Sequence, residues 1–155
     1  MQNLSNEGFY IEYYDSAGLT VSNTTVDGAG GFGIYFYYTG EMPILFDTCT
    51  ITNSFSDGVV LDYGSENVTL RGCAITNNGD DGIETYSGGW DLVLDGCTIT
   101  GNSGNGIYYH SDTGYAGGDG GFITGNTISN NSCGIELYHS SFLTITGNTI
   151  ENNTW

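Results

Sequence analysis

The sequence predicts an all-β solenoid in which a single chain coils through three parallel sheets, and three observations support this prediction. Similar segments recur at intervals of 22 to 29 residues along the chain. Within each interval, short stretches alternate apolar and polar residues, as strands with one buried face do. Apolar spacing of about 3.6 residues, the mark of an amphipathic helix, is not sustained over a useful length.

Three apolar columns define the repeat. The first column consists of Leu4, Val26, Ile51, Ile75, Ile99, Ile128 and Ile150. The second, mostly preceded by glycine, consists of Ile11, Ile34, Val59, Ile83, Ile107 and Ile135. The third consists of the pairs Leu19/Val21, Ile44/Phe46, Val68/Leu70, Leu92/Leu94 and Leu143/Ile145, with Ile123 alone on its rung. Each column predicts one inward-facing strand per period.

Turn residues separate the three strands of each period. In one period the strands are expected at 68–70, 73–75 and 83–85, with Gly72 after the first and Asn77-Asn78 after the second. Glycine and asparagine both tolerate the positive φ that tight turns require. Three such strands cannot enclose a core alone, but stacked periods can. We therefore expect one domain over residues 1–155 with about six turns, either complete or a segment of a longer solenoid.

Segments 125–131 (GNTISNN) and 147–153 (GNTIENN) resemble the repeat of the right-handed parallel β-helix family. The Gly-Ile pairs at 82–83, 106–107 and 134–135 resemble the same repeat. The family includes carbohydrate-binding proteins, sugar hydrolases, pectate-lyase-like proteins and periplasmic NosD-type proteins. The resemblance covers nearly the whole chain and implies a right-handed coil of three sheets. It implies no single activity, because the matching positions are core and turn positions.

The charge balance excludes several classes of function. The chain has 18 acidic residues and a single Lys or Arg, Arg71, which gives a formal net charge of −17. Nucleic-acid binding by phosphate neutralisation needs clustered basic residues and is not expected. A β-helix lyase that uses an Arg or Lys base is not expected either. A membrane span is not expected, because no apolar run approaches the roughly 20 residues that it needs. The acidic composition favours an extracellular or cell-surface location.

Two further columns are expected to be structural. Cys49, Cys73 and Cys97 form an inward column that Asn126 and Asn148 continue, and their 24-residue spacing matches no zinc motif. We expect buried free thiols, since a disulfide between neighbouring rungs would leave the third cysteine unpaired. The second column consists of Asn6, Asn53, Asn77, Asn130 and Asn152. These asparagines are expected at left-handed turns, with their amides bonded to one another along the stack.

The residues one and three positions after the second apolar column are expected to face outward and to form a binding surface. In this alignment Glu12 lies beside Tyr35, and Tyr14 lies beside Tyr37. The candidate binding residues are Tyr14, Tyr35, Tyr37, Asp62, Glu84, Tyr86, Tyr108, His110, Glu136 and Tyr138. Tyrosine stacks on the CH surface of a sugar and still offers a hydroxyl, so it suits glycans and protein interfaces alike. The alternative is that tyrosine occurs here because it favours strands and pairs well across rungs.

Asp57, Asp81 and Glu84 are the candidate catalytic acids of an alternative, enzymatic interpretation. A glycoside hydrolase needs two carboxyl groups about 5 to 9.5 Å apart, and rungs stacked at about 4.8 Å offer such separations. Segment 78–83 (NGDDGI) is similar to the paired-aspartate motif of polygalacturonase-type hydrolases, although the His-Gly and Arg-x-Lys motifs of that family are absent.

Calcium is the one cofactor that the sequence suggests, and the binding interpretation does not require it. The candidate ligands are Asp57 and Asp81, together with Asp112 and Asp119 in the glycine-rich insertion at 111–121. Carboxylate and carbonyl oxygens are the ligands that calcium prefers.

The sequence favours a non-catalytic extracellular module for adhesion, glycan binding or fibre assembly, which acts through its tyrosine and carboxylate face. The alternative is a glycoside hydrolase-like enzyme acting on a polysaccharide. The expected partner is a polysaccharide, a protein surface or a second copy of the chain. Copies stacked end to end would form a filament with a rise of about 29 Å per subunit, six rungs at about 4.8 Å.

Overall fold

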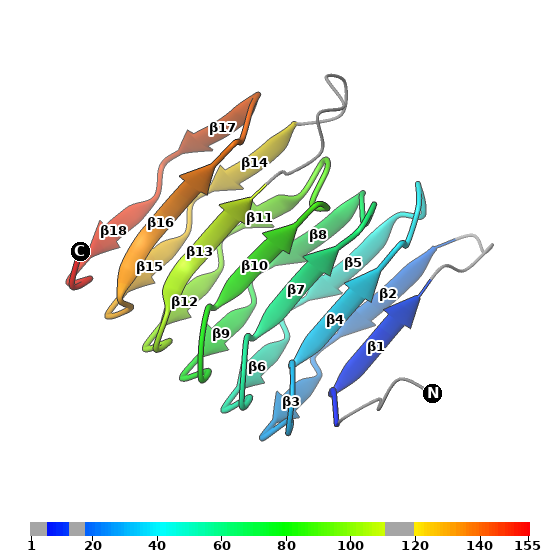
Figure 1. Cartoon of the computed structure of the whole chain (residues 1–155), viewed down its shortest axis with the longest axis horizontal. Helices are drawn as coiled ribbons and strands as arrows, with labels where there is room; N and C mark the ends of the chain where they lie inside the picture. Colours follow the sequence, from blue (N-terminus) through cyan, green and yellow to red (C-terminus); the bar gives the residue numbers. More distant parts are fainter. Residues whose placement is uncertain (1–5, 13–17, 111–119) are drawn as a thin grey trace.

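The computed structural model describes residues 6–12, 18–110 and 120–155, and these residues form 18 strands in three parallel six-stranded sheets (Figure 1). Sheet A contains β1 (Phe9–Glu12), β4 (Ile34–Tyr37), β7 (Val59–Asp62), β10 (Ile83–Tyr86), β13 (Asn105–His110) and β16 (Cys133–Tyr138). Sheet B contains β2 (Leu19–Ser22), β5 (Ile44–Asp47), β8 (Val68–Arg71), β11 (Val93–Asp95), β14 (Gly121–Thr124) and β17 (Leu143–Thr146). Sheet C contains β3 (Thr25–Asp27), β6 (Thr50–Thr52), β9 (Ala74–Thr76), β12 (Thr98–Thr100), β15 (Thr127–Ser129) and β18 (Thr149–Glu151).

The predicted fold class is confirmed, with a small difference in the number of turns. The chain passes from sheet A to sheet B to sheet C and returns to sheet A one rung further along, as Figure 1 shows. Six strands per sheet enclose about five turns rather than six. None of the described residues belongs to a helix able to cross a lipid bilayer.

Strand register confirms the first and third apolar columns wherever the structure describes them. Ile75 pairs with Ile51 on one side and with Ile99 on the other, and Phe46 pairs with Leu70. These side chains are almost completely buried and form one continuous core along the axis. Leu4, the first member of the first column, lies outside the described residues.

The expected register of the second column is wrong on its first rung. Phe9, not Ile11, pairs with Ile34, and Ile11 pairs with Phe36. A shift of two residues leaves the same side chains facing inward, so the apolar alternation alone could not distinguish the two registers. In the observed register Phe9 lies beside Ile34, and its ring packs edge-on against Phe46 with a centroid distance of 5.8 Å.

The cysteine column is confirmed as a row of buried free thiols, and its hydrogen bonds explain why asparagine continues it. The Sγ of Cys73 lies 3.4 Å from the carbonyl oxygen of Phe46, and that of Cys97 lies 3.3 Å from the carbonyl oxygen of Leu70. Further along, Nδ2 of Asn126 donates to the equivalent carbonyl oxygen, that of Leu94, at 3.0 Å. Each side chain in this column therefore donates to a sheet B strand one rung below.

The expected asparagine ladder exists, but one residue later than predicted. Asn77 and its equivalents do adopt the left-handed conformation, with φ of 57° at Asn77. The amide ladder, however, runs through Asn78, Asn102, Asn131 and Asn153. Nδ2 of Asn78 donates to Oδ1 of Asn102 at 2.9 Å, and Nδ2 of Asn102 donates to Oδ1 of Asn131 at 3.0 Å. The ladder residue points inward because the left-handed residue before it turns the chain, so the exposed Asn77 cannot take this role.

Candidate functional site

The outer side of sheet A carries the predicted binding residues, which its parallel register arranges in two columns. The first column is Tyr10, Tyr35, Val60, Glu84, Tyr108 and Glu136. The second column is Glu12, Tyr37, Asp62, Tyr86, His110 and Tyr138. We call these twelve residues the sheet A face. The structure places every predicted binding residue on it except Tyr14, which lies outside the described residues.

The corrected register of β1 changes two members of this face. Tyr10, which the sequence prediction missed, lies beside Tyr35, and Glu12 lies beside Tyr37 rather than beside Tyr35. The alternation Phe9-Tyr10-Ile11-Glu12 already marked Tyr10 as outward-facing. It could have been identified if Phe9 had been aligned with the glycine-preceded isoleucines.

One end of the sheet A face carries a group of nearly parallel tyrosine rings, which we call the N-terminal aromatic cluster. The rings of Tyr10 and Tyr35 are stacked with a centroid distance of 5.6 Å and an interplanar angle of 15°. Tyr35 also stacks on Tyr37 at 6.4 Å, and Tyr37 stacks on Tyr63 at 6.1 Å. Phe32 adds a fifth ring at 5.2 Å from Tyr35. The cluster offers a continuous aromatic surface, with Tyr63 59% exposed at its edge.

The other end carries a second group around His110, which we call the C-terminal aromatic cluster. The imidazole of His110 contacts Tyr86 and Tyr138 edge-on, with centroid distances of 5.4 and 4.9 Å. It stacks on Tyr108 at 5.8 Å, and His139 stacks on Tyr138 at 4.1 Å. His110 is 8% exposed, whereas Tyr86 and Tyr138 are about half exposed. The cluster therefore presents Tyr86, Tyr138 and the exposed His139 to solvent, while His110 lies beneath them.

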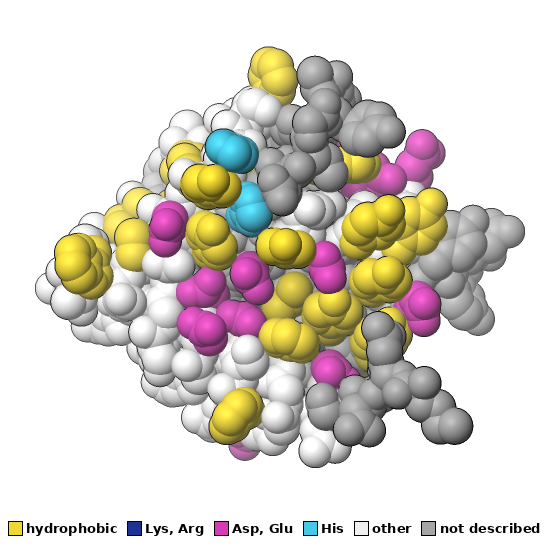
Figure 2. Space-filling model, viewed as in Figure 1, with side chains coloured by type: hydrophobic (Ala, Val, Ile, Leu, Met, Phe, Trp, Pro, Cys, Tyr) yellow, Lys and Arg dark blue, Asp and Glu magenta, His cyan; other side chains and the backbone are white. Residues whose placement is uncertain are grey.

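Carboxylates lie between the two aromatic clusters. Figure 2 shows acidic side chains gathered in the middle of the face, with apolar and histidine side chains beside them. The hydroxyl of Tyr35 donates to Oδ2 of Asp62 at 2.5 Å, which joins the N-terminal aromatic cluster to this acidic region. Burial, followed by this hydrogen bond, raises the pKa of Tyr35, so its hydroxyl remains a proton donor.

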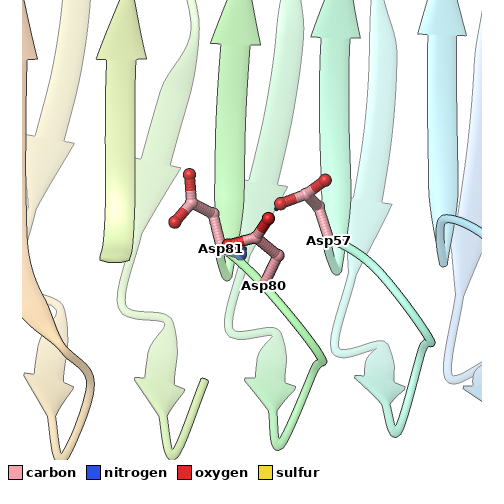
Figure 3. A group of neighbouring side chains, drawn as sticks. All are labelled: Asp57, Asp80 and Asp81. Carbon is pink, nitrogen blue, oxygen red and sulfur yellow. Dashed lines mark hydrogen bonds between the residues drawn. The ribbon is translucent and has the colours of Figure 1, made fainter. Parts of the chain in front are cut away.

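Three aspartates meet where β7 and β10 begin (Figure 3). One oxygen from each of Asp57, Asp80 and Asp81 lies within 4.8 Å of the others. Asp57 and Asp81 are buried, while Asp80 is exposed. Such oxygen atoms suit a hard divalent cation. Of the predicted calcium ligands, Asp57 and Asp81 are thus brought together with Asp80, which was not predicted, whereas Asp112 and Asp119 lie outside the described residues.

Backbone hydrogen bonds hold two of these aspartates in place. Oδ1 of Asp57 accepts from the backbone N–H of Asp81 at 2.8 Å, and its Oδ2 accepts from the hydroxyl of Ser56 at 3.1 Å. Oδ1 of Asp81 accepts from the backbone N–H of Asn105 at 2.5 Å. Both oxygens of Asp57 are therefore engaged, whereas Asp81 uses only Oδ1 in these bonds.

Burial raises the pKa values of two carboxyl groups, Asp81 and Glu84, to near neutral pH. It raises the pKa of Asp81 to about 7, and repulsion from Asp57 adds to the effect while the bond from Asn105 opposes it. Burial also raises the pKa of Glu84 to about 7, with repulsion from Asp57 and Asp81 as the next causes. The three predicted catalytic acids are thus close enough to interact electrostatically. Asp81 and Glu84 can each hold or release a proton near neutral pH.

Solved structures with a similar fold include an alginate epimerase and a mannuronan epimerase. A double mutant of the periplasmic alginate epimerase AlgG superposes with a TM-score of 0.79 at 16% identity, covering 94% of this chain and 36% of that one. The A-module of the Azotobacter vinelandii mannuronan C-5 epimerase AlgE6 superposes with a TM-score of 0.56 at 14% identity, covering 94% of this chain and 54% of that one. At these identities the likeness shows the fold alone, and the chain spans about a third of the length of AlgG.

Sequence comparison identifies the family. A search of curated proteins found no match. The family model described as the right-handed beta helix region matches residues 8–154, nearly the whole chain. Together with the three parallel sheets, this match shows that the chain belongs to the right-handed β-helix family.

Proposed function

We propose that this protein is a carbohydrate-binding β-helix that holds a polysaccharide along the sheet A face. The observation that carries the proposal is the arrangement of two exposed aromatic clusters on either side of a group of carboxylates. Aromatic rings stack on the apolar faces of sugars, while carboxylates accept hydrogen bonds from sugar hydroxyls. Neighbouring side chains of one column are about 4.8 Å apart, a spacing comparable to the length of a pyranose unit in an extended chain.

Sheet C provides an internal comparison that supports a functional reason for the tyrosines. Its outer surface includes the column Thr25, Thr50, Ala74, Thr98, Thr127 and Thr149. This sheet has the same number of strands and the same parallel pairing as sheet A, yet it uses small side chains. The fold therefore does not require aromatic residues at outward positions. A large exposed aromatic patch restricted to one sheet is typical of a contact surface.

Binding to immobilised polysaccharides, measured for matched variants, tests this proposal. Tyr86→Ser removes an exposed ring from the sheet A face, and Phe122→Ser removes an equally exposed ring from the outer side of sheet B. Loss of one stacking contact of about 1 kcal/mol weakens binding about fivefold. We expect this loss for Tyr86→Ser only. Equal losses in both variants, or no retention on neutral, amino and acidic polysaccharides, would contradict the proposal.

An acid–base reaction on the bound polysaccharide is the second candidate function, because Asp81 and Glu84 both have pKa values of about 7. The hydrogen bonds to both oxygens of Asp57 make that residue a positioning group rather than a reacting one. Release of reducing ends from a polysaccharide, lost in Asp81→Asn and Glu84→Gln but retained in the exposed sheet C variant Glu151→Gln, would support catalysis. Retention without turnover supports binding alone.

An extracellular or periplasmic location fits both functions, since the similar epimerases include a periplasmic protein. Adhesion, and fibre assembly by end-to-end stacking of copies, are further proposals for the same solenoid. Electron microscopy tests the assembly: filaments with a rise of about 29 Å per subunit are expected, and short uniform particles alone would contradict it.

A further inference from the structure

We propose that the polysaccharide held on the sheet A face carries positive charge, as a glucosamine polymer with free amino groups does. This inference rests on the proposed function and adds the chemical class of the ligand.

The side chains that carry formal charge on and beside the described face are all acidic. The carboxylates on and beside it are Glu12, Asp57, Asp62, Asp80, Asp81, Glu84 and Glu136. The single Lys or Arg of the chain, Arg71, lies on sheet B. Its guanidinium pairs there with Asp47, with Nη2 and Oδ2 3.1 Å apart. Polyanions such as alginate fragments are therefore repelled, whereas a chain of ammonium groups is electrostatically complementary.

The aromatic residues around the carboxylates suit the same ligand. Glu84 pairs across the rung with Tyr108 and is followed two residues later on the same strand by Tyr86. An ammonium group close to Glu84 would thus also lie near two tyrosine side chains, and aromatic rings attract cations within about 6 Å of their centres. The hydroxyl-bearing tyrosines contact the sugar ring, and the carboxylates neutralise its amino group.

Crowding of the carboxylates provides an independent reason for a cationic ligand. Burial, followed by repulsion from Asp57 and Asp81, raises the pKa of Glu84. A bound ammonium group offsets that repulsion and the cost of burying an ionised carboxyl group. A neutral sugar offers only hydrogen bonds to the same groups.

The test compares three oligosaccharides of equal length with the full chain by calorimetry near pH 7, where Glu84 is partly ionised and a bound ammonium group favours its ionised form. The probes are a glucosamine oligomer, its fully N-acetylated counterpart and an oligouronate. We expect the glucosamine oligomer to bind at least about tenfold more tightly than the N-acetylated one, a difference of 1.4 kcal/mol. We also expect this preference to shrink as sodium chloride is added, because salt screens exposed charges.

Variants test which carboxylate accounts for the preference for the amino form. Glu84→Gln is expected to lose most of the preference for the amino form, while Glu151→Gln, the same change on the outer side of sheet C, keeps it. Equal affinity for the amino and N-acetylated oligomers, or tighter binding of the oligouronate, would overturn the charge inference and leave the proposed function standing. Binding of a lysine oligomer as tight as that of the glucosamine oligomer would overturn it too, since charge alone would then suffice. If none of the oligosaccharides binds, the proposed function itself fails.

Discussion

The backbone N–H of Asp81 donates to Oδ1 of Asp57 across one rung of the solenoid, at 2.8 Å. Asn105 repeats this bond one rung further along, to Oδ1 of Asp81. Asp57 and Asp81, which precede β7 and β10, are therefore part of the scaffold as well as part of the acidic region. Hydrogen bonds from backbone N–H groups favour the ionised carboxyl, but burial opposes ionisation more strongly and leaves the pKa of Asp81 at about 7.

The raised pKa of Asp81 predicts that stability changes with pH. The folded state retains a proton that the unfolded chain releases between pH 3.8 and about pH 7. The free energy of unfolding should therefore fall as pH rises through this window, since the unfolded state binds fewer protons. In Asp81→Asn the neutral amide replaces the protonated acid, and at pH 8 this variant should be more stable than the wild type by about 1 to 2 kcal/mol.

Urea denaturation at several pH values measures this effect. The slope of unfolding free energy against pH should be smaller in Asp81→Asn than in the wild type. Asp95→Asn, which changes a carboxylate at the end of β11 on sheet B, should keep the wild-type slope. Parallel curves for the wild type and Asp81→Asn would show that Asp81 ionises normally in the folded protein.

The buried asparagine ladder predicts a large difference between two adjacent positions in the repeat. Asn102 accepts from the backbone N–H and the side chain of Asn78, and it donates to Asn131 and to the carbonyl oxygen of Ile75. Asn102→Ala should cost about 2 to 4 kcal/mol, because it leaves buried polar groups unpaired. Asn77→Gly should change stability by less than about 1 kcal/mol, since glycine readily adopts the left-handed conformation. Similar losses in both variants would contradict a structural ladder through Asn102.

The main features of the fold could be predicted from the sequence because equivalent positions in successive repeats are apolar and face inward. Ile75 and Ile99 were placed over each other by their 24-residue separation alone, and they pair in the structure. The same logic failed at β1, where Phe9 and Ile11 are both apolar and both face inward. A register error of two residues is invisible to an alternating pattern. Only packing of the Phe9 ring against Phe46 distinguishes the two alignments.

The candidate site was predicted less completely than the fold. Register was enough to bring Glu84, Tyr108 and Glu136 into one column. The meeting of Asp80 with Asp57, in contrast, depends on how the chain turns before β10, and no repeat pattern encodes that local geometry. Electrostatic properties such as the raised pKa of Glu84 depend on burial, which the sequence did not reveal.

The glycine that precedes the first inward residue of a sheet A strand, such as Gly82 before Ile83, is predicted to be irreplaceable. A Cβ atom on Gly82 would lie 2.6 Å from the carbonyl oxygen of Gly106 and 2.7 Å from Cγ2 of Ile99. Both distances are shorter than van der Waals contact, so Gly82→Ala must displace backbone and should destabilise the protein by at least about 3 kcal/mol. Gly96 has φ of 63° and open space around it, so Gly96→Asn should cost less than about 1 kcal/mol. Thermal denaturation of the two variants checks this, and a Gly82→Ala protein as stable as the wild type would contradict the close packing.

The last prediction concerns the four cysteines, which are all free. Cys49, Cys73 and Cys97 are buried in the core, and burial raises the pKa of the Cys49 thiol, whereas Cys133 in β16 is partly accessible. A thiol reacts as its thiolate and only when a reagent can reach it. A maleimide should therefore label one thiol rapidly in the native protein and four after denaturation, as mass spectrometry can count. Cys133→Ser should abolish the rapid labelling without changing the three slow sites. Rapid labelling of a second thiol in this variant would contradict the burial of the cysteine column, because a reagent would then reach one of its sulfur atoms without denaturation.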